Sequence, residues 1–119
     1  METRLGVVEA HFADIVWEYA PLSTKELIQI CEEKLQWKRT TTYTVLKKMC
    51  TKGLFEMKDS QVSVLVSRDE YYALQSEVFV EETFSGSLPA FIAAFTKRKK
   101  LSVKELEDIR TIIDSFGKE

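Results

Sequence analysis

The first 67 residues contain three stretches of helical periodicity followed by two short segments of strand-forming residues, and this order sharply narrows the possible folds. Apolar side chains at helical spacing predict a first helix over residues 4–19. Ser23 and Glu26 form a capping-box pattern, which predicts the start of a second helix. Residues 38–52 carry the apolar spacing of a third helix.

The residue pattern changes from helical periodicity to strand-forming segments after the third helix. Segments 54–58 and 62–66 are short and rich in residues that favour strands. Residues 59–61 between them suit a turn, so the two segments predict one β-hairpin. Three helices followed by a hairpin within residues 1–67 is the order of a winged helix-turn-helix domain.

Residues 68–119 are predicted to form three further amphipathic helices. Capping-box patterns at Ser67–Glu70 and Ser102–Glu105 open two of them, and an apolar stripe over residues 88–95 marks the third. Helices this short are unstable alone and must pack on something. We expect a second copy of the chain to cover them; packing back onto the N-terminal domain is the alternative. The apolar residues expected at the dimer interface are Phe91, Ile92, Phe95, Leu106, Ile109, Ile113 and Phe116.

The overall net charge of −2 by itself argues against a nucleic-acid partner, but the charge is unevenly distributed. Residues 38–52 contain five basic residues and no acidic one. The acidic residues of the N-terminal segment fall largely on the first two helices. A local basic patch on the third helix is the feature that duplex DNA requires.

The third helix also sorts its residues by face. At 100° per residue, Thr42, Val45, Leu46 and Met49 share the face that points to the core. Cations and hydroxyl groups on the other faces suit phosphates and base edges, although a solvated helix face has the same composition. The residues predicted to meet double-stranded DNA are Lys38, Arg39, Thr40, Thr41, Tyr43, Thr44, Lys47 and Lys48, with Lys58 from the hairpin.

The sequence offers no catalytic, metal or cofactor pattern. His11 has no nucleophile or acid arranged around it, and Cys31 continues an apolar row of the second helix. The two cysteines form no disulfide framework, which fits a reducing, cytoplasmic location. The longest uncharged run, residues 84–96, is too short to cross a bilayer. We therefore expect a protein that is not an enzyme, has no cofactor and does not enter a membrane.

The order of short motifs along the chain resembles the penicillinase-repressor family of winged-helix repressors. The resemblance rests on Trp17 and Pro21 before the second helix, on Trp37 with the following KRTTTYTVLKKM segment, and on Lys52-Gly53-Leu54. It continues through residues 69–71 and 86–88, through Phe95, and through residues 101–102 and 105–113. Membership would imply a homodimer whose winged helices bind a palindromic operator, with Thr41, Tyr43, Thr44 and Lys48 facing the DNA. It would also imply C-terminal helices that form the dimer and an upstream sensor protein or inducer that releases it.

Three positions depart from the family pattern. Gln61 and Val62 stand where relatives often carry a Gly-Arg pair at the wing tip, so we expect a small contribution from the wing. Ala94-Phe95 replaces the Asn-Phe bond at which sensor-controlled members are cleaved. The C-terminus lacks the Cys-x-Cys pairs of copper-sensing members, so we expect no cuprous site.

A second function remains open at the level of sequence. The N-terminal 67 residues carry nine basic and nine acidic residues, and the wing departs from the family pattern. Both features also fit a dimeric protein-interaction module whose winged helix no longer binds DNA.

Overall fold

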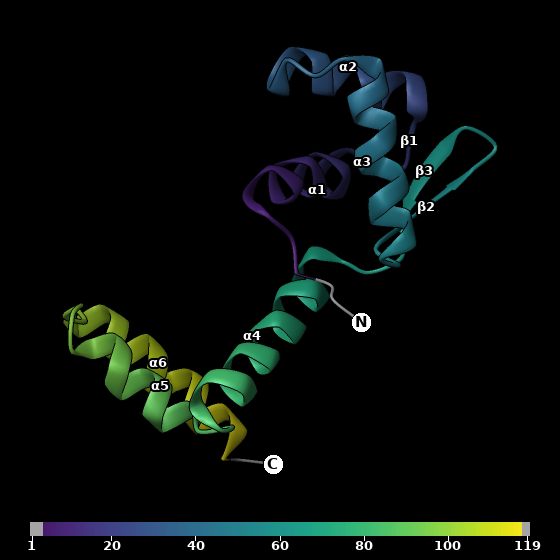
Figure 1. Cartoon of the computed structure of the whole chain (residues 1–119). Coiled ribbons are helices and arrows are strands. Elements are labelled where there is room, and N and C mark those ends of the chain that lie inside the picture. Colours follow the sequence, from purple (N-terminus) through teal and green to yellow (C-terminus); the bar gives the residue numbers. More distant parts are fainter. Residues whose placement is uncertain (1–3, 118–119) are drawn as a thin grey trace. The chain divides into compact units, whose positions relative to one another are not determined.

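The computed structural model describes residues 4–117, and it confirms the prediction of a mainly α-helical protein with a small hairpin (Figure 1). Residues 1–3 and 118–119, at the outer ends of the two predicted domains, lie outside the described residues. The elements are α1 Val7–Tyr19, β1 Leu22–Ser23, α2 Thr24–Leu35, α3 Arg39–Thr51, β2 Phe55–Lys58, β3 Gln61–Val64, α4 Arg68–Phe84, α5 Leu88–Thr96 and α6 Val103–Phe116.

The three predicted capping boxes are present and fix where their helices begin. The side chain of Ser23 accepts a hydrogen bond from the Glu26 amide, while the Glu26 carboxylate accepts one from the Ser23 amide. The same reciprocal pair opens α4 at Ser67–Glu70 and α6 at Ser102–Glu105. Each box satisfies two amides that a helix start leaves without partners.

The first helix is shorter than predicted. It begins at Val7, because Gly6 is extended and its amide donates to the Glu9 carboxylate at 3.0 Å. The third helix ends close to its predicted end, at Thr51. Gly53 follows with a φ of +83°, a left-handed conformation that glycine adopts without strain.

The hairpin turn is one residue shorter than predicted. Its loop consists of Asp59 and Ser60 alone, both with positive φ, as in the turns that match the twist of paired strands. Gln61 is the first residue of β3, and Val62 is fully buried. The expectation that Gln61 and Val62 occupy the wing tip is therefore wrong, because the alternation of a strand turns Val62 into the core.

A third strand was not predicted. Residues Leu22–Ser23 pair antiparallel with β3, opposite Val62 and Gln61, which gives the strand order β1-β3-β2. The amide of Thr24 also donates to the carbonyl of Ser60 at 2.9 Å. The hairpin tip is thus joined to the start of α2.

Every buried apolar residue of the described chain lies between Phe12 and Tyr71. Three of the four residues on the predicted inner face of α3, Thr42, Leu46 and Met49, are buried. The fourth, Val45, is half-buried against the same core. The indole of Trp17 closes the core by donating to the carbonyl of Val66 at 2.9 Å. This packing holds α3 rigidly and leaves its opposite face in solvent.

Contacts divide the chain into two compact units, with the boundary inside α4 between Gln75 and Ser76. In the second unit a ring cluster joins the end of α4 to α5, with Phe79 and Phe84 each against Phe91. No residue from Ser76 to Gly117 is buried. Within residues 4–117 no single helix is long and apolar enough to cross a membrane; α4 and α5 reach that length only as a pair bent by 83°.

Candidate nucleic-acid interface

The predicted DNA-facing residues form one exposed surface on α3. Seven of them, Lys38, Arg39, Thr40, Thr41, Thr44, Lys47 and Lys48, are exposed, and Tyr43 is half-buried. Lys58 is exposed as well, but it lies at the end of β2 beside the hairpin turn. The structure thus places seven of the nine residues on α3, Lys38 at its N-cap and the ninth on the hairpin.

The first turn of α3 is open to an anion. Lys38 precedes the helix, and its side chain makes no capping hydrogen bond. The first amides of a helix have no intrahelical acceptor, and the helix dipole concentrates positive potential there. The guanidinium of Arg39 lies over the Tyr43 ring, 5.6 Å from its centroid. The start of α3 thus combines uncapped backbone amides with two neighbouring cations, Lys38 and Arg39, and this combination suits a phosphate.

The hydroxyl groups of α3 are not equivalent. Thr44 donates its hydroxyl to the carbonyl of Thr40 at 2.9 Å, and Thr51 donates to Lys47 at 3.0 Å. A phosphate oxygen only accepts, so these two hydroxyl protons are already in use. The side chains of Thr40 and Thr41 make no hydrogen bond within the described residues and are free to donate.

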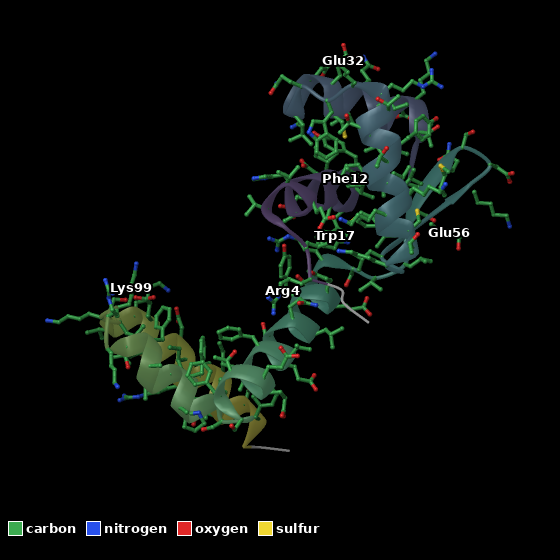
Figure 2. All side chains as sticks on the ribbon, in the orientation of Figure 1. Arg4, Phe12, Trp17, Glu32, Glu56 and Lys99 are labelled. Atoms are coloured by element: carbon green, nitrogen blue, oxygen red, sulfur yellow. The ribbon has the colours of Figure 1, made fainter. Side chains whose placement is uncertain are left out.

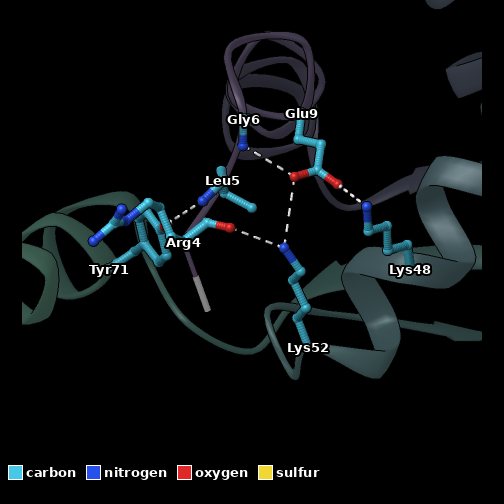
Figure 3. Close-up of polar contacts among 7 residues, drawn as sticks. All are labelled: Arg4, Leu5, Gly6, Glu9, Lys48, Lys52 and Tyr71. Carbon is cyan, nitrogen blue, oxygen red and sulfur yellow. Dashed lines mark hydrogen bonds and ion pairs between the residues drawn. The ribbon is translucent and has the colours of Figure 1, made fainter. Parts of the chain in front are cut away.

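Two lysines of the basic patch are engaged by an acidic residue of α1 (Figure 3). The Nζ of Lys48 lies 2.7 Å from Oε2 of Glu9, and the Nζ of Lys52 lies 3.5 Å from Oε1. Lys52 also donates to the carbonyl of Arg4 at 2.9 Å, and its side chain is only 14% exposed. Hydrogen bonds from Lys48 and from the Gly6 amide lower the pKa of Glu9 to about 2. Lys48 is therefore a shared cation, whereas Lys47 makes no ion pair within residues 4–117.

A groove of about 450 Å³ borders the α3 surface where the first turns of α2 and α3 approach the hairpin tip. Arg39 and Tyr43 line one side of it. The residues that line the rest, none of which was predicted to meet DNA, are Ser23, Thr24, Lys25, Ile28 and Ser60. The capping box predicted that Lys25 lies in the first turn of a helix. Its proximity to α3 is a tertiary contact with no local signal.

The thiols show no sign of activation. Cys31 is fully buried, as its place in an apolar row predicted, and Cys50 is half-buried. Burial raises the pKa of both thiols, which keeps them protonated and poorly nucleophilic. His11 is exposed on α1.

Comparison with known proteins gives a consistent result over nearly the whole chain. The family described as Penicillinase repressor matches residues 5–115. The chain is 23% identical over 115 residues to the methicillin resistance regulatory protein MecI of Staphylococcus aureus strain Mu50, covering 93% of this chain and 94% of that protein. It is 22% identical over the same shares to MecI of Mammaliicoccus sciuri. It is 18% identical over 121 residues to the penicillinase repressor of Staphylococcus aureus, covering 98% and 96%. The matched family is one of repressors, which are regulatory proteins and not enzymes, and the chain belongs to the penicillinase repressor family.

Proposed function

We propose that this protein represses transcription by binding palindromic operator DNA as a homodimer. Residues 1–67 would act as the winged-helix DNA-binding domain and residues 68–119 as the dimerisation region. The first turn of α3 would enter the major groove, as the recognition helix of this class of fold does. Lys38, Arg39, Thr40, Thr41, Tyr43, Thr44, Lys47, Lys48 and Lys58 would meet the duplex.

The observation that carries this proposal is the outward face of α3. A row of buried residues on the opposite side anchors the helix in the core. Among the cations predicted to meet DNA, only Lys48 is paired with an acid within residues 4–117. The first turn of α3 adds uncapped amides and two free threonine hydroxyl groups. Such a surface neutralises phosphates and also donates to base edges.

The groove beside α3 supports a wider contact than the helix alone. Lys25 and the Ser23–Thr24 turn lie next to Arg39, and Ser60 brings the hairpin tip to the same groove. A DNA strand that passes over α3 would therefore meet α2 and the hairpin tip as well. The tip itself offers Asp59 and Ser60, so Lys58 would be the wing's cationic contribution.

The test is a titration of labelled duplex DNA with the purified full chain across a salt series. A random-sequence duplex measures the contribution of phosphates, and fragments selected from the source genome by binding measure operator recognition. We expect affinity for both to fall steeply as salt rises, with each phosphate contact adding about 0.9 to the log–log slope. Salt-independent binding, or none, would favour the alternative of a protein-interaction module.

The dimer part of the proposal rests on the second unit. Its apolar residues have no buried core of their own, since no residue from Ser76 to Gly117 is buried. Burial of apolar area is the main term that stabilises helices of this length. The interface residues would be Phe91, Ile92, Phe95, Leu106, Ile109, Ile113 and Phe116. Two-fold pairing would also present two recognition helices to a palindrome.

A further inference from the structure

The hairpin of α5 and α6 ends in a run of four cations. Residues Lys97–Lys100 form the turn between the two helices, and all four are exposed. Figure 2 labels Lys99 at this end of the hairpin. None of the four makes an ion pair within the described residues. Hydrogen bonds from Ser102 lower the pKa of Glu105, and the charge of Lys99 adds to this effect, so Lys99 has an acid close by.

The opposite end of the same unit is acidic. Glu77, Glu81 and Glu82 lie on the last two turns of α4, exposed and without an ion pair among residues 4–117. The carboxylate of Glu81 lies at the α4–α5 joint, where a Cβ added at Gly86 would come within 3.1 Å of its Oε1. The contact of the Phe79 ring with Phe91 fixes this part of α4 on α5.

Each of these clusters repels itself in a single chain. Glu77 and Glu81 stand four residues apart on one helix face, a spacing at which like charges destabilise a helix. The nine residues of α5, about 13 Å long at 1.5 Å per residue, lie between the basic turn and the joint where Glu81 stands. That separation exceeds the screening length of about 8 Å in physiological salt.

An apolar surface lies between the two charged ends. Phe91, Ile92 and Phe95 of α5 line a pocket of about 180 Å³ together with Thr96, Leu101 and Ile109. The lining is almost wholly carbon, and the pocket can receive an apolar side chain. On α6, Ile113 and Phe116 are 54% and 71% exposed and extend this surface.

A two-fold axis that brings this face onto its own copy must lie in the plane of contact. If the axis runs along the hairpin, the copies are parallel and like ends meet, cation on cation and acid on acid. If it runs across the hairpin, the copies are antiparallel and each basic turn meets the partner's acidic joint. Like charges placed together cost free energy, and opposite charges at an interface fix its register.

We infer that a second copy of the chain docks antiparallel on the α5–α6 face, with Lys97–Lys100 of each copy against Glu77, Glu81 and Glu82 of the other. This rests on the proposed homodimer and specifies its geometry. The apolar face supplies the buried area, and the two charged ends select the orientation.

A charge exchange within one chain tests the inference. The turn variant carries Lys97→Glu, Lys99→Glu and Lys100→Glu, and the joint variant carries Glu77→Lys, Glu81→Lys and Glu82→Lys. In antiparallel docking each variant alone places like charges together, and we expect its dimer dissociation constant in sedimentation to rise by about tenfold or more. The combined variant has the parent's net charge and restores opposite charges, so its dissociation constant should return toward the parent's. In parallel docking neither single variant would weaken the dimer.

Two controls accompany the exchange. A chain with Lys25→Glu, Lys34→Glu and Lys38→Glu changes net charge as much as the turn variant, but within the first unit, and should keep the parent's dissociation constant. Circular dichroism of every variant confirms that the helices are retained. The effect of the turn variant should shrink near 1 M salt, where the screening length falls to about 3 Å.

Cross-linking reads the orientation without relying on electrostatics. In a Cys50→Ser background, chains with Lys99→Cys and with Glu81→Cys are mixed and oxidised. Antiparallel docking yields the 99–81 heterodimer, and a 99–99 homodimer in its place would overturn the inference. A monomeric parent would overturn the proposed homodimer as well. A dimeric parent whose turn variant dimerises normally but loses affinity for random-sequence duplex would overturn only the docking and assign the basic turn to nucleic acid.

Discussion

Lys48 of α3 and Glu9 of α1 form an ion pair with 2.7 Å between Nζ and Oε2. The pair joins the helix that faces the proposed DNA to the helix behind it, and Lys52 approaches the same carboxylate from one turn further along α3. Figure 3 shows both lysines converging on Glu9. Glu9 therefore stabilises the position of α3 and lowers the positive potential of its outer face.

The first prediction concerns acid stability. The pKa of Glu9 is lowered from its ordinary value of 4.5 to about 2 in the folded protein. A lowered pKa contributes stability that is present above pH 4.5 and is lost as the pH falls toward 2. Glu9→Gln should therefore lose less unfolding free energy than the parent between these two pH values. Denaturant titrations across that range measure the difference, with Glu18→Gln on the same helix as a control of equal charge change. Parallel pH profiles for Glu9→Gln and the parent would contradict the prediction.

The second prediction separates the two adjacent lysines of α3. Lys47 makes no ion pair within residues 4–117, so Lys47→Ala should lower the log–log salt slope of duplex binding by about 0.9. Lys48 already neutralises Glu9, so it neutralises a DNA phosphate less completely than Lys47 does and releases fewer counterions from the DNA. Lys48→Ala should therefore lower the slope by less than Lys47→Ala. Fluorescence anisotropy with a random-sequence duplex measures both slopes. Equal losses for the two variants would show that the ion pair opens on binding.

The third prediction concerns the buried hydroxyl of α3. Thr42 is 1% exposed, and its Oγ1 has no hydrogen-bond partner of good geometry within the described residues. The Thr42 hydroxyl lies close enough to the Cys31 thiol to act on the pKa of that thiol, but a thiol is a weak hydrogen-bond partner. Thr42→Val should raise the free energy of unfolding by about 1 kcal/mol, because it removes a polar group buried without compensation. Thr41→Val makes the same change on the exposed face and should leave stability within about 0.5 kcal/mol.

The fourth prediction concerns the dimer. Ile109→Asp with Ile113→Asp places two charges on the apolar face of α6, where an interface would bury them at high cost. The chain should become monomeric with its first unit folded, and its affinity for a selected genomic fragment should fall by orders of magnitude. Sedimentation and fragment titration measure the two effects. Thr111→Asp with Ser115→Asp adds the same charges at the same spacing on the opposite face of α6 and should leave both properties intact. A monomeric double-isoleucine variant that binds the fragment as well as the parent would refute the link between dimerisation and recognition.

The fifth prediction concerns release from DNA. A sensor protease specific for the family's Asn-Phe bond should leave the parent chain intact, because Ala94 occupies the position of the asparagine. Ala94→Asn should restore cleavage between residues 94 and 95. Mass spectrometry after co-expression with such a sensor identifies the fragments. Cleavage of the parent at that bond would show that the asparagine is not required.

The sequence determined the features that depend on neighbours along the chain. Ser23, Ser67 and Ser102 each predicted a helix start, because a capping box closes within four residues. The periodicity of α3 predicted which side is buried, and Thr42, Leu46 and Met49 confirm it. The same periodicity predicted that the basic residues of α3 lie on its outer face.

Only the tertiary structure decided the contacts between distant segments. The strand Leu22–Ser23 exists because β3 pairs with it some 40 residues later, and two residues carry no periodicity of their own. Val62, expected at the wing tip from the family pattern, is a core residue, because Asp59 and Ser60 alone form the turn and β3 already begins at Gln61. Glu9 likewise restrains Lys48 from 39 positions away. The sequence predicts that Glu9 and Lys48 lie on two different helices, but only the packing of α1 against α3 brings the two side chains within reach of each other.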